Sequence, residues 1–391
     1  MANKKHYNSL LNLIIPAILI NLVTGSVYCW SLLSKAVMET FNCTKFQADI
    51  SFSLAIFFLG MSGAVFGSIA EKNPKLMYIL STITFILGLV VSGLACLTGY
   101  IELLWIGFGI LLGTGCGTSY VANPKSLSVW FRHNKGKGTS IAILSFGFAK
   151  VFGTMIIQFL LAHFSLFGTL MIMSGIYFVP MMISTLLFKK IPFKLNDKVS
   201  TESIWNIVKT KKYMAIWFMF CANITCGLAF IANEAPMLRT FGFGMVAIGL
   251  ISSLSSVFNS LGRFGFAALS DWKGREYAYY VVFGISILAC LMNLSYAPFI
   301  FVIALMMVNM GYGGRIFSIT IFNNKTLWNH KDKYDSRINF EWLGNAEVYS
   351  GPLLANTLSY QTLLWVLAGI YGISFVAVKA FIKQDINKVK G

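Results

Sequence analysis

Long apolar stretches separated by short polar segments make up most of the chain. Each stretch has about the 20 residues that an α-helix needs to cross the hydrocarbon core of a bilayer. The stretch at 338–358 contains Glu341 and Glu347, and it is counted as a span because an even number places both termini on one side. The pattern predicts an all-α membrane protein with twelve transmembrane helices, at residues 9–33, 46–70, 76–97, 101–123, 138–162, 167–188, 213–236, 247–270, 277–296, 299–322, 338–358 and 361–382.

The composition excludes a soluble protein. Of the 391 residues, 57% are hydrophobic and 12% are charged, whereas soluble domains carry roughly 25% charged residues. The spans fill almost the whole chain and leave no room for a soluble catalytic domain. Because no nucleophile–base pair emerges either, we predict a protein that is embedded in the lipid bilayer and is not an enzyme.

The distribution of positive charge indicates how the chain is oriented. The formal charge of +17 would indicate a nucleic-acid partner in a soluble protein, but in a membrane protein it marks cytoplasmic loops. Most cations lie on the side of both termini, whereas the opposite side holds Lys35, Lys45 and Arg239. We therefore predict cytoplasmic termini in a plasma-membrane protein with no nucleic-acid partner. Five more cations lie inside or at the ends of spans: Lys125, Lys150, Arg263, Arg315 and Lys325.

A polar linker and an internal repeat divide the chain into two halves. The linker at 189–212 separates the spans of 1–188 from those of 213–391. Three short segments recur in the same order at a nearly constant separation, as secondary transporters with duplicated halves show. They are EKNPK and DWKGR (71–75 and 271–275), GTGCG and GYGGR (113–117 and 311–315), and GFAKVF and GNAEVY (147–152 and 344–349).

Four segments resemble the major facilitator superfamily and, within it, the oxalate/formate antiporter group, which is related to monocarboxylate transporters. They are TGSVYCWSLL (24–33), FSLAIFFLGMSGAVFG (52–67), GILLGTGCGTSYVANPKSLSVWF (109–131) and NSLGRFGFAALSDWKGR (259–275). The resemblance implies two pseudo-symmetric six-helix bundles, a monomer, and a central site that is exposed alternately to each side. The group carries small carboxylates and places an arginine in span eight, which Arg263 matches, and a lysine in span eleven, where this chain has Glu347.

Arg263 is the leading candidate for binding a carboxylate, because a guanidinium can hold it through two parallel hydrogen bonds. The alternative partner, Asp271, lies about 12 Å further along the helix, which favours the substrate role. Arg315 is a second candidate cation, and its alternative role is an ion pair with Glu341. The repeat makes Lys150 equivalent to Glu347, so both are candidates for the substrate path, or for an ion pair between the two bundles.

Glu234 is a candidate proton carrier or ligand for a substrate ammonium group, and Glu347 is another. The alternative for Glu234 is an outer-gate contact with Arg239. The resemblance also implies that four aromatic residues lie in cavity-lining spans: Tyr28, Trp30, Tyr120 and Tyr349. It further implies a cytoplasmic gate made of Glu71, Lys75, Asp271 and Arg275.

These features predict a secondary active transporter of a small mono- or dicarboxylate, working as an antiporter or a proton symporter by alternating access. The additional carboxylates in the spans leave a zwitterion such as an amino acid as an alternative substrate. A transporter-like receptor that binds without translocating is the other alternative. No phosphate-binding loop and no metal-ligand spacing occurs, and the seven cysteines form no CxxC pair, so we expect no cofactor and no metal.

Overall fold

The computed structural model is helical, without strands, over the residues that it describes, which are 8–131, 135–189, 211–295, 297–314 and 360–381. Within these ranges, eight helices are long and apolar enough to cross a membrane, and two shorter apolar helices lie at Pro298–Gly314 and Thr362–Val378. With helix α10 (Lys211–Thr240), every predicted span except the eleventh coincides with a helix over its described residues, and the tenth is described only as far as Gly314. The eleventh predicted span, at 338–358, lies outside the described residues.

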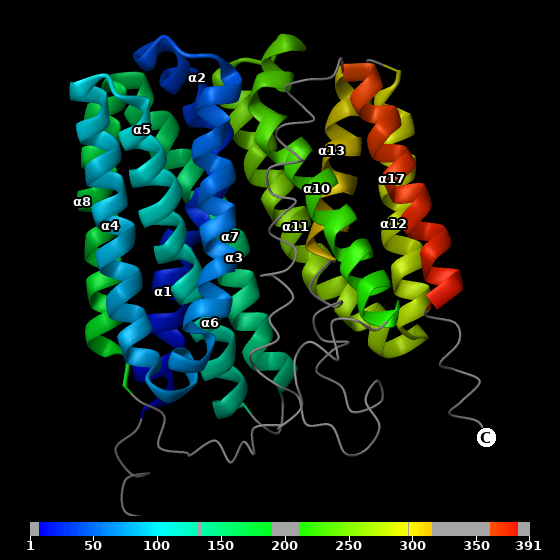
Figure 1. The fold of residues 1–391 in the computed structure, drawn as a ribbon, viewed down its shortest axis with the longest axis horizontal. Helices are drawn as coiled ribbons and strands as arrows, with labels where there is room; N and C mark the ends of the chain where they lie inside the picture. The colour runs from blue at the N-terminus through cyan, green and yellow to red at the C-terminus, as the bar shows by residue number, and fades with distance from the viewer. Residues whose placement is uncertain (1–7, 132–134, 190–210, 296, 315–359, 382–391) are drawn as a thin grey trace, which may run out of the picture. The chain divides into compact units, whose positions relative to one another are not determined.

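The contacts divide the chain into two compact units (Figure 1). The first comprises residues 1–197 and 243–253, and the second comprises 198–242 and 254–391. The division into halves at 1–188 and 213–391, which the sequence predicts, stays a prediction.

Span one of the first unit is a continuous helix with two irregular segments. It runs through η1 (Leu10–Ile14), α1 (Ile15–Thr24), η2 (Gly25–Cys29) and α2 (Trp30–Phe41), where η1 is a π-helix and η2 a 3₁₀-helix. Such a segment within a helix re-aims the side chains that follow it. The other helices of this unit are α3 (Lys45–Lys72), α4 (Pro74–Thr98), α5 (Ile101–Leu104), η3 (Trp105–Leu112), α6 (Gly113–Trp130), α7 (Lys135–His163) and α8 (Leu166–Leu187).

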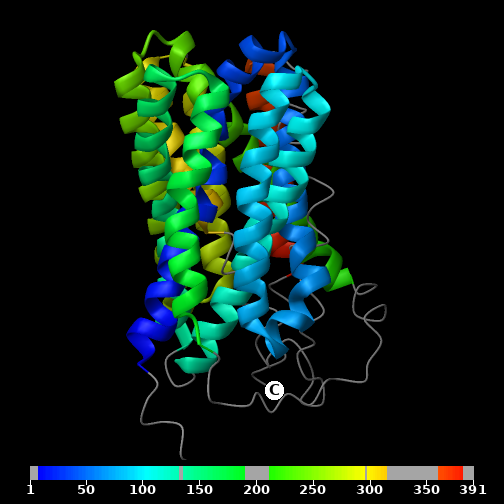
Figure 2. The ribbon, with the colours of Figure 1, turned by 90° about the vertical axis from the view of Figure 1, so that its left-hand side faces the viewer.

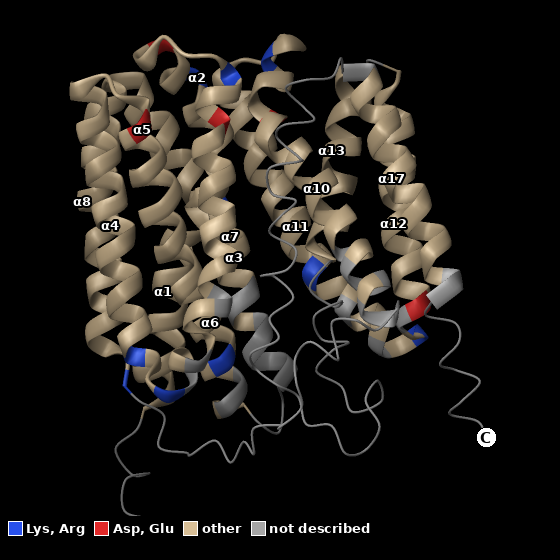
Figure 3. Cartoon of the chain, in the orientation of Figure 1, with Lys and Arg blue, Asp and Glu red and all other residues tan. Residues whose placement is uncertain are grey.

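Helix ends in this unit follow local sequence signals. Thr44 and Gln47 form a capping box at the start of α3, which satisfies two backbone N–H groups at that end. Gly99 closes α4 in the left-handed conformation that glycine adopts without strain. Figure 2 shows the helices from the side, and Figure 3 shows Lys and Arg at the end where α3 meets α4. This end of α3 and α4 is therefore polar, as expected where membrane-spanning helices leave the bilayer.

Buried polar side chains connect four helices of the first unit. The Tyr78 hydroxyl on α4 donates to the Asn123 oxygen on α6. Asn123 donates to Asn21 on α1 at 2.6 Å, and Asn21 donates to Ser145 on α7 at 3.3 Å. Buried amides and hydroxyls are costly unless they are hydrogen-bonded, so this chain of bonds defines how the four helices are rotated relative to one another.

The second unit contains α10, α11 (Met245–Lys273), α12 (Arg275–Asn293), α13 (Pro298–Gly313) and α17 (Tyr360–Phe381). Helix α11 contributes to this unit from Leu254 onward. Helix α12 packs against α13 and α17, and α10 also contacts these two helices. The chain turns from α11 into α12 at Gly274, whose φ of +88° favours glycine.

Candidate functional site

One face of α11 is polar and yet buried. Ser255, Asn259 and Arg263 are spaced four residues apart, Ser256 and Ser260 each follow one of them directly, and all five are buried. This spacing places them on one side of the helix. An apolar helix that carries a continuous polar face inside a membrane protein faces a polar neighbour or a pathway, because lipid cannot satisfy its hydrogen bonds.

Arg263 is held by the residue one turn before it. Its side chain is buried, with 3% of the residue exposed, and its Nε donates to the Oδ1 of Asn259 at 2.9 Å. Long helical side chains lean back toward the N-terminus, so the i, i+4 spacing brings the two groups together. A buried charge at membrane depth is costly unless it is paired with another group or binds a ligand.

Glycines bring α13 directly against the turn that carries Arg263. A Cβ on Gly313 would overlap the Asn259 carbonyl oxygen and lie 3.1 Å from the Arg263 nitrogen. A Cβ on Gly262 would overlap the Met310 carbonyl oxygen. The two backbones therefore touch without intervening side chains, in the manner of small-residue contacts between transmembrane helices.

Glu234 lies on α10 of the same unit and is completely buried. It accepts a hydrogen bond from the Ser255 hydroxyl at 2.8 Å. Ser255 and Asn259 are one turn apart, which is about 6 Å along the helix. On the polar face of α11, Ser255 thus contacts the carboxylate of Glu234, and Asn259, one turn further along, contacts the guanidinium of Arg263.

Lys150 lies in the first unit, on α7, and is buried. Its backbone carbonyl accepts a hydrogen bond from the Cys29 thiol at 3.6 Å. A Cβ on Gly153 would come within 2.9 Å of the Cys29 sulfur, so α7 packs closely on the 3₁₀ segment η2 at this point. The backbone of Lys150 therefore lies beside the 3₁₀ segment of span one.

Two of the predicted aromatic residues meet near Phe146, one turn before Lys150 on α7. The Tyr28 ring contacts Phe146 edge-on at 5.9 Å between centroids, and the Tyr120 ring does so at 5.1 Å. Tyr28 is buried and Tyr120 is half-buried. The structure therefore brings Tyr28 and Tyr120 into one aromatic group on the turn of α7 that precedes Lys150.

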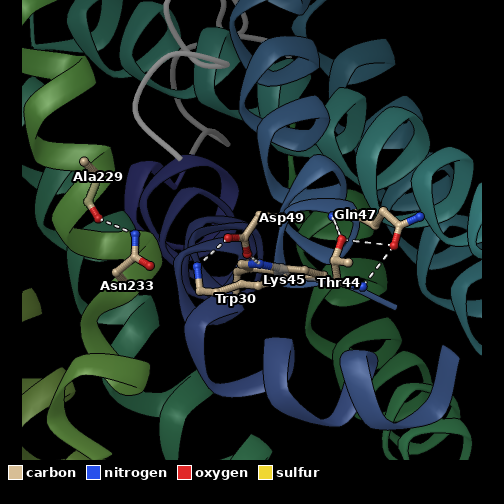
Figure 4. Close-up of polar contacts among 7 residues, drawn as sticks. All are labelled: Trp30, Thr44, Lys45, Gln47, Asp49, Ala229 and Asn233. Atoms are coloured by element: carbon tan, nitrogen blue, oxygen red, sulfur yellow. Dashed lines mark hydrogen bonds and ion pairs between the residues drawn. The ribbon is translucent and has the colours of Figure 1, made fainter. Parts of the chain in front are cut away.

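Trp30, the third predicted aromatic residue, has a polar partner that the sequence analysis missed. Its indole Nε1 donates to the Asp49 carboxylate at 2.9 Å, and Lys45 donates to the other carboxylate oxygen at 2.6 Å (Figure 4). The Trp30 ring packs on Phe108 at 4.8 Å. The Lys45–Asp49 spacing at the start of α3 indicates the ion pair, because residues four apart are neighbours on a helix, but the contact with Trp30 has no signal in the sequence.

The remaining predicted site residues lie in parts that the structure describes incompletely. The predicted gate residues Glu71, Lys75, Asp271 and Arg275 lie on helices α3, α4, α11 and α12. Of these four, Lys75 is exposed. Among the described residues there is also no cluster of His, Cys, Asp or Glu that could hold a metal ion. The other predicted residues lie outside the described residues: Arg315, Glu341, Glu347 and Tyr349.

Comparison with known proteins gives the class of protein that this architecture represents. Residues 14–326 match the Major Facilitator Superfamily, so the chain belongs to this family of membrane transporters and is not an enzyme. The resemblance seen in the sequence is confirmed, and with it the fold of two six-helix bundles.

Two curated relatives are similar over much of the chain. The uncharacterized MFS-type transporter YhjX of Escherichia coli (strain K12) is 26% identical over 270 residues, which are 67% of this chain and 66% of the relative. The oxalate:formate antiporter of Oxalobacter formigenes is 22% identical over 283 residues, which are 70% of this chain and 66% of the relative. Each match thus spans slightly less than two thirds of the relative's own length.

Solved structures show the same fold at lower identity. An outward-facing bacterial homologue of the iron transporter ferroportin aligns with a TM-score of 0.63 and 12% identity, covering 95% of this chain and 99% of that one. A point mutant of the nucleoside transporter NupG aligns with a TM-score of 0.66 and 16% identity, covering 95% of this chain and 100% of that one. These structures establish the architecture of the chain.

Proposed function

We propose that the protein is a secondary active transporter of a small organic anion, a mono- or dicarboxylate, and that it works by alternating access as an antiporter or a proton symporter. The observation that carries this proposal is the buried Arg263, whose guanidinium is oriented by Asn259 on the polar face of α11. A carboxylate without a cation is very costly to place at membrane depth. The similarity to the oxalate:formate antiporter supports the same substrate class.

In this mechanism Arg263 neutralises the carboxylate and fixes its orientation. We assign supporting roles to Lys150 and Arg315 as further cations, and to Glu347 as a charged group on the path. The aromatic residues Tyr28, Trp30, Tyr120 and Tyr349 would close around the remainder of the substrate, because each combines an apolar face with a polar tip.

The rest of the proposal concerns the setting in the membrane. We place a monomeric protein in the plasma membrane with both termini in the cytoplasm, as the excess of Lys and Arg in the loops on that side indicates. Glu71, Lys75, Asp271 and Arg275 would act as the cytoplasmic gate, through ion pairs and helix-end dipoles.

Counterflow in proteoliposomes tests the proposed function. Liposomes that contain the purified protein would be loaded in turn with formate, acetate, lactate, oxalate, malonate or alanine, and the uptake of the same labelled compound would be measured. We expect uptake above protein-free liposomes for at least one carboxylate and none for alanine. Uptake of alanine alone would overturn the anion proposal, and binding without uptake of any compound would favour a receptor.

A zwitterionic substrate is the second candidate, and one observation favours it. The buried Glu234 meets Ser255 one helical turn before Asn259, the residue that holds Arg263. An amino acid could place its carboxylate on Arg263 and its ammonium group near Glu234. Transport of alanine in the same assay, lost in both Arg263→Gln and Glu234→Gln, would establish this candidate instead.

For a carboxylate substrate, we predict that Glu234 couples transport to protons. In Glu234→Gln, accumulation driven by an inward proton gradient should fall at least 10-fold, because the amide cannot take up and release a proton. Counterflow, which needs no gradient, should stay within about 2-fold of wild type. These rates would be measured side by side in proteoliposomes.

Glu102→Gln provides the matched control, since Glu102 is an exposed glutamate in α5. It should retain both the gradient-driven and the counterflow rates. Equal loss of the two rates in Glu234→Gln, or equal retention of both, would contradict a coupling role for Glu234.

A further inference from the structure

We propose that Asn259 is a positioning residue that sets how Arg263 receives its ligand. It would turn the guanidinium so that the two terminal nitrogens form an end-on fork for the substrate carboxylate, and it would add a donor of its own beside that fork. This inference rests on the proposed function and names the binding geometry of the same site.

The first step concerns the side of the guanidinium that Asn259 occupies. A guanidinium can hold a carboxylate side-on, through Nε and one terminal nitrogen, or end-on, through both terminal nitrogens. The Nε of Arg263 already donates to the Asn259 Oδ1 at 2.9 Å. Side-on binding would have to displace this bond, whereas a carboxylate can take the end-on fork and leave the bond in place.

The second step concerns the orientation of the Asn259 amide. A guanidinium has only donors, so the amide atom that faces Nε must be the oxygen. The Nδ2 group of Asn259, with its two N–H donors, therefore points away from Nε. Together the two side chains present donors and a positive charge, an arrangement that matches an acceptor-only anion such as a carboxylate.

The third step concerns the backbone beneath the pair. Gly313 of α13 lies against the Asn259 carbonyl and the Arg263 nitrogen, where a Cβ would have no room. Both residues are also buried, with 8% of Asn259 and 3% of Arg263 exposed. The turn that carries the pair is thus supported by the neighbouring helix, and preorganised donors of this kind bind with little loss of entropy.

Two substitutions separate positioning from a merely structural role. Asn259→Leu removes the acceptor for Nε, whereas Asn259→Asp keeps an acceptor of the same shape and adds a negative charge that neutralises the guanidinium. We expect the half-saturating concentration for [¹⁴C]formate and [¹⁴C]oxalate to rise about 10-fold in Asn259→Leu and about 100-fold in Asn259→Asp, as the loss of charge-assisted hydrogen bonds implies.

Thermal stability in detergent should follow the opposite order. Asn259→Asp keeps the hydrogen bond to Arg263 and should melt at a higher temperature than Asn259→Leu. A residue that only stabilises the fold would instead give the same order in both measurements, with the leucine variant worse in each. That result would overturn the inference.

Asn309 on α13 provides the matched control, because it is also buried and donates to the Leu305 carbonyl at 3.0 Å within its own helix. Asn309→Leu and Asn309→Asp should leave the half-saturating concentration within about 2-fold of wild type. If Arg263→Gln loses uptake while the Asn259 variants behave like the Asn309 variants, only the inference fails. If wild type takes up no carboxylate of the counterflow panel, formate and oxalate included, or if Arg263→Gln keeps the wild-type value, the proposed function fails and the inference fails with it.

Discussion

Replacement of Arg263 by glutamine is expected to lower carboxylate uptake at least 100-fold. The amide of glutamine is polar, but its side chain is shorter and lacks the positive charge and the fork of donors. Each hydrogen bond to a charged group contributes about 1.5–3 kcal/mol, and the loss of two of them corresponds to at least two orders of magnitude. Initial rates of labelled carboxylate counterflow in proteoliposomes would measure the effect.

Two further variants give this experiment its controls. Arg263→Lys keeps the charge but not the fork, so its rate should fall between those of wild type and Arg263→Gln. Lys35→Gln removes a cation from an exposed pair with Glu39 on α2 and should leave the rate within about 2-fold of wild type. Wild-type uptake by Arg263→Gln would show that the transporter does not use this guanidinium for its substrate.

Introduction of a leucine at Gly313 is expected to separate α13 from α11 and to abolish transport. Even a Cβ at this position would overlap the Asn259 carbonyl oxygen, and a backbone atom cannot move aside as a flexible side chain can. Overpacking of this kind costs about 1–3 kcal/mol or more. The melting temperature in detergent should fall by several degrees, and counterflow should drop to the level of protein-free liposomes.

Gly265→Ala is the matched control for Gly313→Leu. Gly265 lies on α11 only two residues after Arg263, and a Cβ there would meet nothing within 4 Å. Alanine is also the better helix former by about 1 kcal/mol, so this variant should melt no lower than wild type and transport at the normal rate. A Gly313→Leu protein with wild-type stability and uptake would contradict the close packing of α11 and α13.

The spans could be predicted from the sequence because membrane insertion depends on local composition. About twenty apolar residues make a span wherever they occur in the chain, and a charged residue inside a span is visible as an exception. Arg263, Lys150 and Glu234 were singled out in this way, and each proves to be buried. The family was likewise recognisable, since its motifs are short, continuous segments.

The irregular parts of the helices were not predicted. Within span one, η2 is a 3₁₀-helix, and within span four, η3 is a π-helix. Their residues are as apolar as those of a regular helix, so hydropathy carries no sign of the change in winding. The close contact of Gly153 with Cys29 in η2 shows where packing against another helix adds information that is absent from local composition.

The partners of the buried polar groups divide into those that spacing could indicate and those that it could not. Asn259 and Arg263 are four residues apart on one helix, so their contact follows from helical geometry. Glu234 and Ser255 lie on different helices, as do Asn21 and Asn123. Their pairing depends on how each helix is rotated about its own axis, which hydropathy does not specify.

The sequence by itself determined where the helices lie along the chain, which family the protein belongs to, and which charged residues occur at membrane depth, because each of these depends on residues that are close together in the chain. The tertiary structure alone decided that Glu234 meets Ser255, that Asp49 holds the Trp30 indole, and that Gly313 supports the turn of Arg263. The physical reason is that buried polar groups need partners, and those partners come from whichever helix packs against them.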